Sequence, residues 1–418
     1  MKVLIVTYYW PPSGGGGVQR WLKFATYLDK LGCECVVYTP SNPDVPVLDS
    51  SLVDEVPEGV EVLTLPIKEP SRVLKNLTGK SASQRMGASG SGSKKSLISK
   101  LSLWVRGNFY VPDARVGWVK PSVVFLKKWL AENSVDAIIT TGPPHSMHLI
   151  GLGIKNVNPQ IPWIADFRDP WSDMDYLADF KMGKRAKEKM EFLEQKVSGL
   201  ADRLIVTSRG ASKKLVGDKK AICVVIPNGW DAADFPKSLP KSQNRSSLRI
   251  GHFGALHGSR NATGLWEALA KMKSNGREIE LVLAGSVSDE IKNDLKEFGL
   301  SENTDLIGLL SHKNSIEEML KCDALLMIHN NTESATKSTP GKLFEYLATS
   351  KPIISVCRSQ GDLASLLSDL GLPHAQHSDA ESCLDMIENL KNQSPANPAP
   401  YTRMKQAEKL LEVIKSTQ

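Results

Sequence analysis

The segment 338–352 carries the residue types best suited to bind a phosphorylated ligand. A turn of small residues opens an expected helix there, and the free N–H groups at a helix start attract anions. Lys342 can contact phosphate oxygens, while Glu345, on the same helical face, can accept two hydrogen bonds from a ribose. The pattern suits a nucleoside diphosphate, and an exposed Lys342–Glu345 ion pair on an ordinary helix is the alternative.

A run of four glycines, 14–17, follows an expected strand and opens an expected helix, so its backbone amides could hold a phosphate. The run does not fit the dinucleotide fingerprint Gly-x-Gly-x-x-Gly, because the last position falls on Gln19 or Arg20. A flexible turn remains the alternative, since glycines also serve tight turns. The motif therefore indicates a phosphate loop or a turn, and not a nicotinamide site.

His145 begins an expected helix directly after a strand that ends at Thr141. At the carboxyl edge of a sheet this imidazole could contact a sugar hydroxyl or a phosphate. A lone histidine is more often a hydrogen-bonded structural residue, and both roles stay open here.

Three charged residues, Asp166, Arg168 and Asp169, cluster at the end of another strand. They could bind the hydroxyls of an acceptor, or they could hold the wall of the site together by ion pairs. Alternate residues of a strand point to opposite faces, so the three cannot all point the same way while the strand continues. We favour Asp166 and Arg168.

The second half of the chain repeats this layout at 252–261. Gly254 follows a strand and allows close approach of a ligand, and Arg260 near the next helix start is suited to a diphosphate. A solvated loop arginine is the alternative.

Composition describes an ordinary soluble globular protein of 418 residues, 41% hydrophobic and 23% charged, long enough for two domains. No apolar run reaches the roughly 18 to 20 residues that cross a bilayer, and the opening apolar stretch is too short for a signal peptide. We therefore expect a cytoplasmic protein. The six cysteines show no Cys-x-x-Cys pair, which predicts reduced thiols and no zinc site.

The excess positive charge lies in 94–128, where eight basic residues stand against one acidic residue. Aromatic residues are interleaved with them: Trp104, Phe109, Tyr110, Trp118 and Phe125. The mixture predicts an anionic membrane surface or lipid carrier as partner and a location peripheral to the inner face of the membrane. Nucleic acid is less favoured, because no nucleic-acid-binding signature occurs. Aromatic residues packed in a core with lysines outside are the structural alternative.

Strands alternate with helices throughout, which predicts an α/β protein with doubly wound parallel sheets. The expected strands are 2–7, 33–39, 136–141, 163–167 and 203–208, then 248–253, 279–284, 305–309, 324–329 and 353–357. The expected domains are 1–236 with a mobile insertion at about 80–99, a polar linker at 237–247, a second domain at 248–398 and a final helix within 399–418.

Together these passages resemble the family 4 glycosyltransferases of the GT-B fold, especially bacterial cell-envelope members. The resemblance spans nearly the whole chain. It rests on the first strand with its Pro-Pro and glycine loop, Ile-Pro-Asn-Gly-Trp-Asp at 226–231, Phe-Gly at 253–254, and Pro-Gly-Lys-Leu-Phe-Glu-Tyr at 340–346.

The resemblance implies two Rossmann-like domains facing across a cleft, with the C-terminal helix packing back on the first. It further implies a retaining, metal-independent enzyme without a cofactor, which moves a sugar from a nucleotide sugar to a glycan or lipid-linked acceptor. The implied catalytic residues are His145, Arg260 and Lys342. The implied donor-binding residues are Gly16, Gly17, Gly254, Arg260, Thr339, Pro340, Gly341, Lys342 and Glu345, and the acceptor would meet Asp166, Arg168 and Asp169.

One position departs from the family, which often carries a glutamate eight residues before the ribose-binding one. Here that position is Lys337, so the usual carboxylate contact to the donor sugar is in doubt. Two other functions stay open: a nucleotide-sugar epimerase or hydrolase of the same fold, and a non-catalytic glycan- or nucleotide-binding protein.

Overall fold

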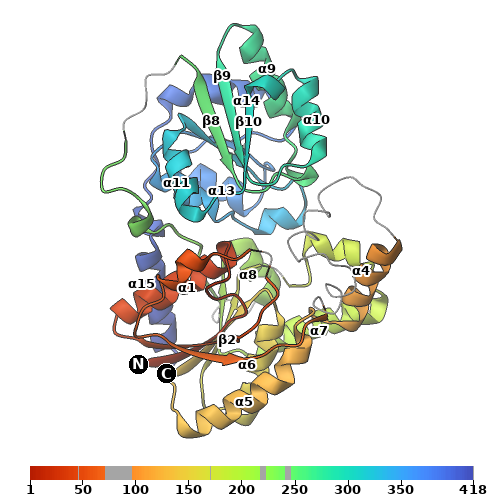
Figure 1. The fold of residues 1–418 in the computed structure, drawn as a ribbon, viewed down its shortest axis with the longest axis vertical. Coiled ribbons are helices and arrows are strands. Elements are labelled where there is room, and N and C mark those ends of the chain that lie inside the picture. The colour runs from red at the N-terminus through yellow and green to blue at the C-terminus, as the bar shows by residue number, and fades with distance from the viewer. Residues whose placement is uncertain (46, 71–96, 170, 217–222, 241–245, 418) are drawn as a thin grey trace. The chain divides into compact units, whose positions relative to one another are not determined.

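A computed structural model describes residues 1–45, 47–70, 97–169, 171–216, 223–240 and 246–417. Contacts divide the described chain into two compact units (Figure 1). The first contains the residues up to 227 together with those from 403 onward, and the second contains 228–402. The chain therefore leaves the first unit, builds the second, and returns to the first.

The first unit is built on a seven-stranded sheet in the order β3-β2-β1-β4-β5-β6-β7, in which every neighbouring pair is parallel. The strands are β1 Lys2–Val6, β2 Glu34–Pro40, β3 Glu61–Leu65, β4 Ala137–Gly142, β5 Trp163–Phe167, β6 Arg203–Val206 and β7 Cys223–Val225. The helices are α1 Gly16–Lys30, α4 Leu97–Phe109, α5 Val119–Glu132, α6 Ser146–Val157, α7 Lys184–Leu200, α8 Arg209–Val216 and α15 Arg403–Lys415.

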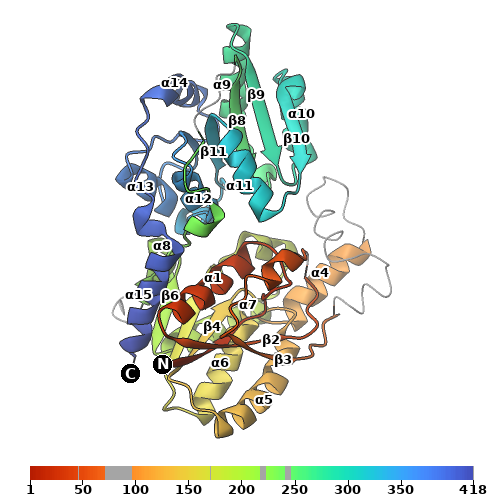
Figure 2. The same cartoon turned by 60° about the vertical axis from the view of Figure 1, so that its left-hand side comes forward.

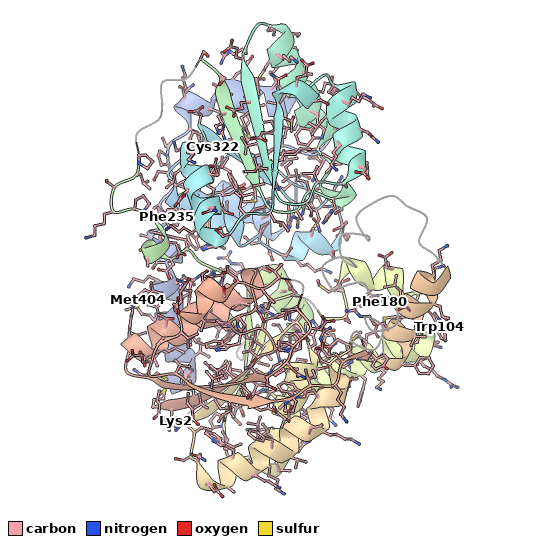
Figure 3. The ribbon with its side chains drawn as sticks, in the orientation of Figure 1. Lys2, Trp104, Phe180, Phe235, Cys322 and Met404 are labelled. Carbon is pink, nitrogen blue, oxygen red and sulfur yellow. The ribbon has the colours of Figure 1, made fainter. Side chains whose placement is uncertain are left out.

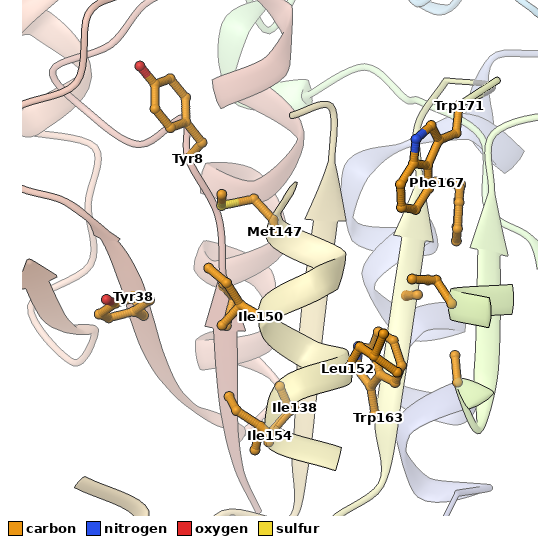
Figure 4. Close-up of a cluster of buried hydrophobic side chains, with 14 of the residues drawn as sticks. Tyr8, Tyr38, Ile138, Met147, Ile150, Leu152, Ile154, Trp163, Phe167 and Trp171 are labelled. Atoms are coloured by element: carbon orange, nitrogen blue, oxygen red, sulfur yellow. The ribbon is translucent and has the colours of Figure 1, made fainter. Parts of the chain in front are cut away.

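Each face of this sheet has its own hydrophobic core, because successive strand residues point to opposite sides. Along β1, Val3 and Ile5 join a core with α1 and α15, while Leu4 and Val6 join one with α5, α6 and α7. Figure 4 shows the core on the α5, α6 and α7 side of this sheet, in which α6 lies along the strands. The return of α15 to the first unit confirms the predicted packing of the C-terminal helix.

The second unit has a five-stranded parallel sheet in the order β10-β9-β8-β11-β12. Its strands are β8 Leu248–Phe253, β9 Ile279–Ala284, β10 Thr304–Gly308, β11 Ala324–Ile328 and β12 Ile353–Val356. Its helices are α9 Thr263–Ser274, α10 Asp289–Glu297, α11 His312–Lys321, α12 Lys342–Ala348, α13 Asp362–Asp369 and α14 Ala380–Glu388. Helices cover both faces of this sheet as well (Figure 2), which confirms the predicted pair of Rossmann-like units.

Two parts of the predicted domain layout fall on residues without a description. Residues 80–96 of the predicted insertion and 241–245 of the predicted linker lie outside the described residues. Residues 97–99 of the insertion form the start of α4. Residues 228–236 group with the second unit, although the sequence placed them in the first. Trp230 accounts for this grouping, because its backbone N–H donates to Tyr401 O and its indole N–H to Pro398 O.

The basic aromatic stretch 94–128 divides into two environments. Trp118 is buried and stacks on Tyr38 with ring centroids 4.9 Å apart, and Phe125 stacks on the same ring at 5.5 Å. Trp104 and Phe109 of α4 are exposed and contact each other edge to face. The core alternative is therefore correct for Trp118 and Phe125, and the exposed aromatic surface belongs to α4.

Candidate active site

The sheet of the second unit reverses its strand order between β8 and β11, and in open α/β sheets ligands bind beside the carboxyl ends of the strands at such a point. Arg260 follows β8, and its Nε donates to Oδ1 of Asn330, which follows β11, at 2.6 Å. Nη1 of Arg260 donates to Ala255 O at 2.7 Å. The arginine is thus fixed across the switch point by uncharged partners.

Lys342, the first residue of α12, points at the same place. Its Nζ lies 3.1 Å from Nε2 of His252, whose Nδ1 donates to Leu326 O at 2.9 Å. That second bond leaves Nε2 as the acceptor, and burial holds the pKa of His252 well below its ordinary value, so the imidazole is neutral. The ammonium of Lys342 therefore has a neutral acceptor as its hydrogen-bond partner.

The two cations disfavour each other. Burial first, and then the charge of Arg260, lowers the pKa of Lys342 well below its ordinary value, partly offset by Glu345. Burial also lowers the pKa of Arg260. Two half-buried positive charges close together are unfavourable until an anion neutralises them, so the arrangement favours an anion at this point.

Gly254 leaves space beside the ammonium group of Lys342. Its φ of 131° strongly favours glycine, and a Cβ built there would lie 3.4 Å from Nζ of Lys342. Gly285, at the end of β9, packs so closely that a Cβ would meet the carbonyl of Gly254 at 2.4 Å. The two glycines let the loops after β8 and β9 lie against each other beside the ammonium.

Glu345 lies one turn further along α12 and is half-buried. Its Oε1 lies 3.0 Å from Nε2 of His312, the first residue of α11. The predicted alternative, an exposed ion pair between Glu345 and Lys342, is not what the structure shows, because each has a different hydrogen-bond partner. Thr339 and Pro340 lie half-buried ahead of α12, and a Cβ on Gly341 would approach Asn228 Nδ2 at 3.3 Å.

In the first unit the corresponding switch point lies between β1 and β4, and Arg168 occupies it. Its Nη1 donates to Gly17 O at 2.8 Å and its Nε to Gly142 O at 3.2 Å, while Nη2 donates to Pro143 O. The guanidinium thus ties the start of α1 to the loop after β4. Gly16 and Gly17 begin α1, and their predicted contact with donor phosphates stays a prediction.

Asp166 lies inside β5 with no exposed surface. Its carboxylate accepts from Nη2 of Arg20 at 2.9 Å, from the indole of Trp21 at 2.8 Å and from the hydroxyl of Thr141 at 2.9 Å. The structure does not support the acceptor role predicted for Asp166, because these bonds commit the carboxylate to the interior. Asp169 is half-buried, and burial raises its pKa. Its contact with an acceptor stays a prediction.

His145 lies in a buried column of rings. It stacks on Trp171 with centroids 4.9 Å apart and planes at 4°, and His148 and Phe167 stack beside it. This environment favours the structural alternative, and a contact between His145 and a sugar stays a prediction. Nδ1 of His148 lies 2.9 Å from the hydroxyl of Thr140.

Residues 235–393 match the family described as Glycosyl transferases group 1. They form a group 1 glycosyl transferase domain. The match includes β8 to β12 and every second-unit residue predicted to bind the donor, and it ends before α15.

Solved structures with the same fold extend the comparison to the first unit. The apo lipopolysaccharide outer core galactosyltransferase WaaB has a TM-score of 0.62 at 12% identity, covering 100% of both chains. Anabaena HepE in complex with UDP and glucose has a TM-score of 0.61 at 15% identity, also covering 100% of both. These likenesses show the fold, which is the predicted GT-B fold.

The GT-B fold also occurs in a protein described with a different chemistry. A putative UDP-N-acetylglucosamine 2-epimerase from Listeria monocytogenes has a TM-score of 0.57 at 14% identity, covering 99% of this chain and 96% of that one. No curated protein matches the chain. The fold alone therefore does not choose between transfer and epimerisation, whereas the group 1 domain favours transfer.

Sequence reasoning missed three residues of this site: Asn330, His312 and Asp234, which approaches the far side of His312. Asn330 and His312 also follow strands, so the rule that placed Arg260 could have found them. In the described part of the chain, no group of three His, Cys, Asp or Glu side chains is placed to hold a metal ion.

Proposed function

We propose that this chain is a retaining glycosyltransferase that takes a sugar from a nucleotide sugar. Arg260 and Lys342 would bind the diphosphate, and Glu345 would accept hydrogen bonds from the ribose hydroxyls. The observation that carries the proposal is the pair of half-buried cations held by neutral partners inside a group 1 glycosyl transferase domain.

The same cations supply a route to catalysis. When the bond between the sugar and the diphosphate breaks, negative charge develops on the departing phosphate oxygens. Preorganised donors in a water-poor site stabilise such charge strongly, and removing one commonly costs on the order of 3 kcal/mol of transition-state stabilisation. The acceptor hydroxyl would attack the anomeric carbon from the face that the diphosphate leaves and pass its proton to the departing phosphate oxygen, so the configuration is retained and no protein nucleophile is needed. With Arg260 and Lys342 in this role, the reaction does not require a metal ion.

The acceptor would bind to the first unit, where Asp169 remains available near the carboxyl end of β5. Arg168 and Asp166 would stabilise this edge of the sheet. Arg168 does so by donating to backbone carbonyls, and Asp166 by accepting from Arg20. We propose a cell-envelope glycan or a lipid-linked sugar as the acceptor.

A panel of nucleotide sugars, offered with and without membrane lipid extract, tests the proposed function. We expect transfer of a labelled sugar to lipid or glycan. Conversion of the donor without any acceptor would favour the epimerase or hydrolase, and binding without turnover would favour a non-catalytic protein. Either result overturns the proposal.

The proposed partner surface is an anionic membrane, contacted by α4 and the segment that packs on it. Leu101, Trp104 and Phe109 of α4 are 61%, 43% and 68% exposed. Asn108 fixes α4 to the start of α7, because its Oδ1 accepts from Gly183 N at 2.7 Å (Figure 3 labels the neighbouring Trp104 and Phe180). The same region carries exposed basic residues on α4 and in 181–189: Lys100, Arg106, Lys181, Lys184, Arg185, Lys187 and Lys189.

Exposed apolar side chains accompanied by basic ones are typical of proteins that lie on anionic lipid. No described helix is long and apolar enough to cross a bilayer. We propose a peripheral position at the inner face of the membrane, with the surface shifted from 94–128 to α4 and 181–189. Replacing Trp104 and Phe109 together by serine should reduce pelleting with phosphatidylglycerol vesicles, whereas Leu306→Ser in the second unit should not. Equal pelleting of both proteins would contradict this placement.

A further inference from the structure

Two carboxylates approach opposite sides of the imidazole of His312. Its Nε2 lies 3.0 Å from Oε1 of Glu345, and its Nδ1 lies 3.9 Å from Oδ2 of Asp234. The side chains of His312, Glu345 and Asp234 are 27%, 22% and 19% exposed, so each retains a face toward solvent. Three separate elements of the second unit thus meet at one ring.

The two distances decide where the imidazole donates. A separation of 3.0 Å is a normal hydrogen-bond length, whereas 3.9 Å is too long for one. A neutral imidazole carries one N–H, which these distances place on Nε2, facing Glu345. Protonation adds an N–H on the Asp234 side and keeps the one on Nε2. In both states His312 donates to Glu345.

Both ends of this hydrogen bond stand on rigid elements. His312 is the first residue of α11, which is capped by Ser311 accepting from Asn314 N at 3.2 Å and is anchored by buried Ile316 and Met319. Glu345 belongs to α12, whose neighbouring side chains Phe344 and Tyr346 are fully buried. The position of the imidazole therefore restricts the rotamer of the glutamate.

We infer that His312 is a positioning residue, which holds the Glu345 carboxylate ready for the two hydroxyls of a ribose. This inference rests on the proposed nucleotide-sugar function. An ionised carboxylate offers about four acceptor positions, of which His312 takes one, so enough remain for a cis-diol. A glutamate held in its binding rotamer loses less side-chain freedom when the nucleotide arrives.

Titration calorimetry with UDP, GDP and ADP identifies the diphosphate that the wild-type protein binds most tightly. The same diphosphate is then compared with its 2′,3′-dideoxy analogue, which lacks the hydroxyls. We expect His312→Ala to weaken the ribose form about tenfold and to leave the dideoxy form unchanged. His312→Gln should recover part of the loss, because its amide N–H can reach the same carboxylate. His374→Ala, a half-buried histidine in the same unit, is the matched control.

Equal weakening of both ligands by His312→Ala would overturn the inference, since it would show a structural role. Unchanged discrimination between the two ligands would overturn it as well. In a Glu345→Ala background, His312→Ala should cause no further loss, and an additional loss there would show that the histidine does not act through Glu345. Failure of the wild-type protein to bind any of the diphosphates would instead overturn the proposed function, and this inference with it.

Discussion

The two units reverse their strand order in the same way but treat the resulting switch point differently. In the first unit, the guanidinium of Arg168 donates hydrogen bonds to backbone carbonyls, and Asp166 forms an ion pair with Arg20. In the second unit, Arg260 and Lys342 are held by an amide, a carbonyl and a neutral imidazole. A charge paired with an opposite charge inside the protein, as Asp166 is with Arg20, is already neutralised, whereas Arg260 and Lys342, which hydrogen-bond to uncharged groups, can still attract an anion. The predictions below test this difference.

Asp166→Ala should cause the largest loss of stability. It leaves Arg20 buried without its carboxylate partner, and breaking a buried ion pair costs about 3 to 5 kcal/mol. Urea unfolding measures the change. If Asp166→Ala unfolds like the wild type, the pair is not what holds this edge of the first sheet.

Lys342→Ala should lower kcat/KM by on the order of 3 kcal/mol of transition-state stabilisation, roughly a hundredfold, without lowering stability. The variant removes a cation that Arg260 disfavours, so the unliganded protein loses nothing comparable to the Asp166 change. Initial rates and urea unfolding on the same preparation separate the two effects. Lys296→Ala, which replaces an exposed lysine of α10, is the control. Unchanged turnover in Lys342→Ala would remove it from the site.

His148 should make the first unit sensitive to acid. Burial, followed by the charge of Arg168, lowers the pKa of His148 to about 3, below its ordinary value of 6.5. The unfolded chain therefore takes up this proton first, and stability present above pH 6.5 is lost as the pH falls toward 3. Between pH 7 and 5 the histidine should account for about 2 kcal/mol. His148→Phe should flatten that part of a stability-against-pH curve, and an unchanged slope would contradict the assignment.

Gly254→Ala should destabilise the protein less than Asp166→Ala does. An alanine at φ 131° is strained by about 1 to 3 kcal/mol, and its methyl group would lie against the Lys342 ammonium. We expect weaker nucleotide binding together with a modest loss of stability, measured by calorimetry and thermal unfolding. A variant that loses stability but binds nucleotide normally would place the ligand away from this loop.

The sequence predicted most strands of both sheets, because central strands buried on both faces read as continuous apolar runs, as in β1 and β11. It missed β3 and β7, whose residues are exposed or half-buried and carry no such run. These two strands lack the signal because their side chains are covered less completely.

For the candidate site, local sequence could suggest only residues near strand ends and helix starts. Lys342, Glu345 and Arg260 follow from strand ends and helix starts, which lie within a few residues. The role of Asp166 could not be read from its neighbours, because its partner Arg20 is 146 residues away in the chain. The contact between His312 and Glu345 was hidden for the same reason, since their elements meet only after folding.

The return of α15 to the first unit determines the order in which the two units can complete folding during synthesis. Ala407, Leu410 and Ile414 complete the core that α1 and β1 begin, so the first unit lacks part of its interior until those residues leave the ribosome. The second unit, made of one continuous stretch, can assemble during synthesis. The half that starts the polypeptide is therefore the half that finishes folding last.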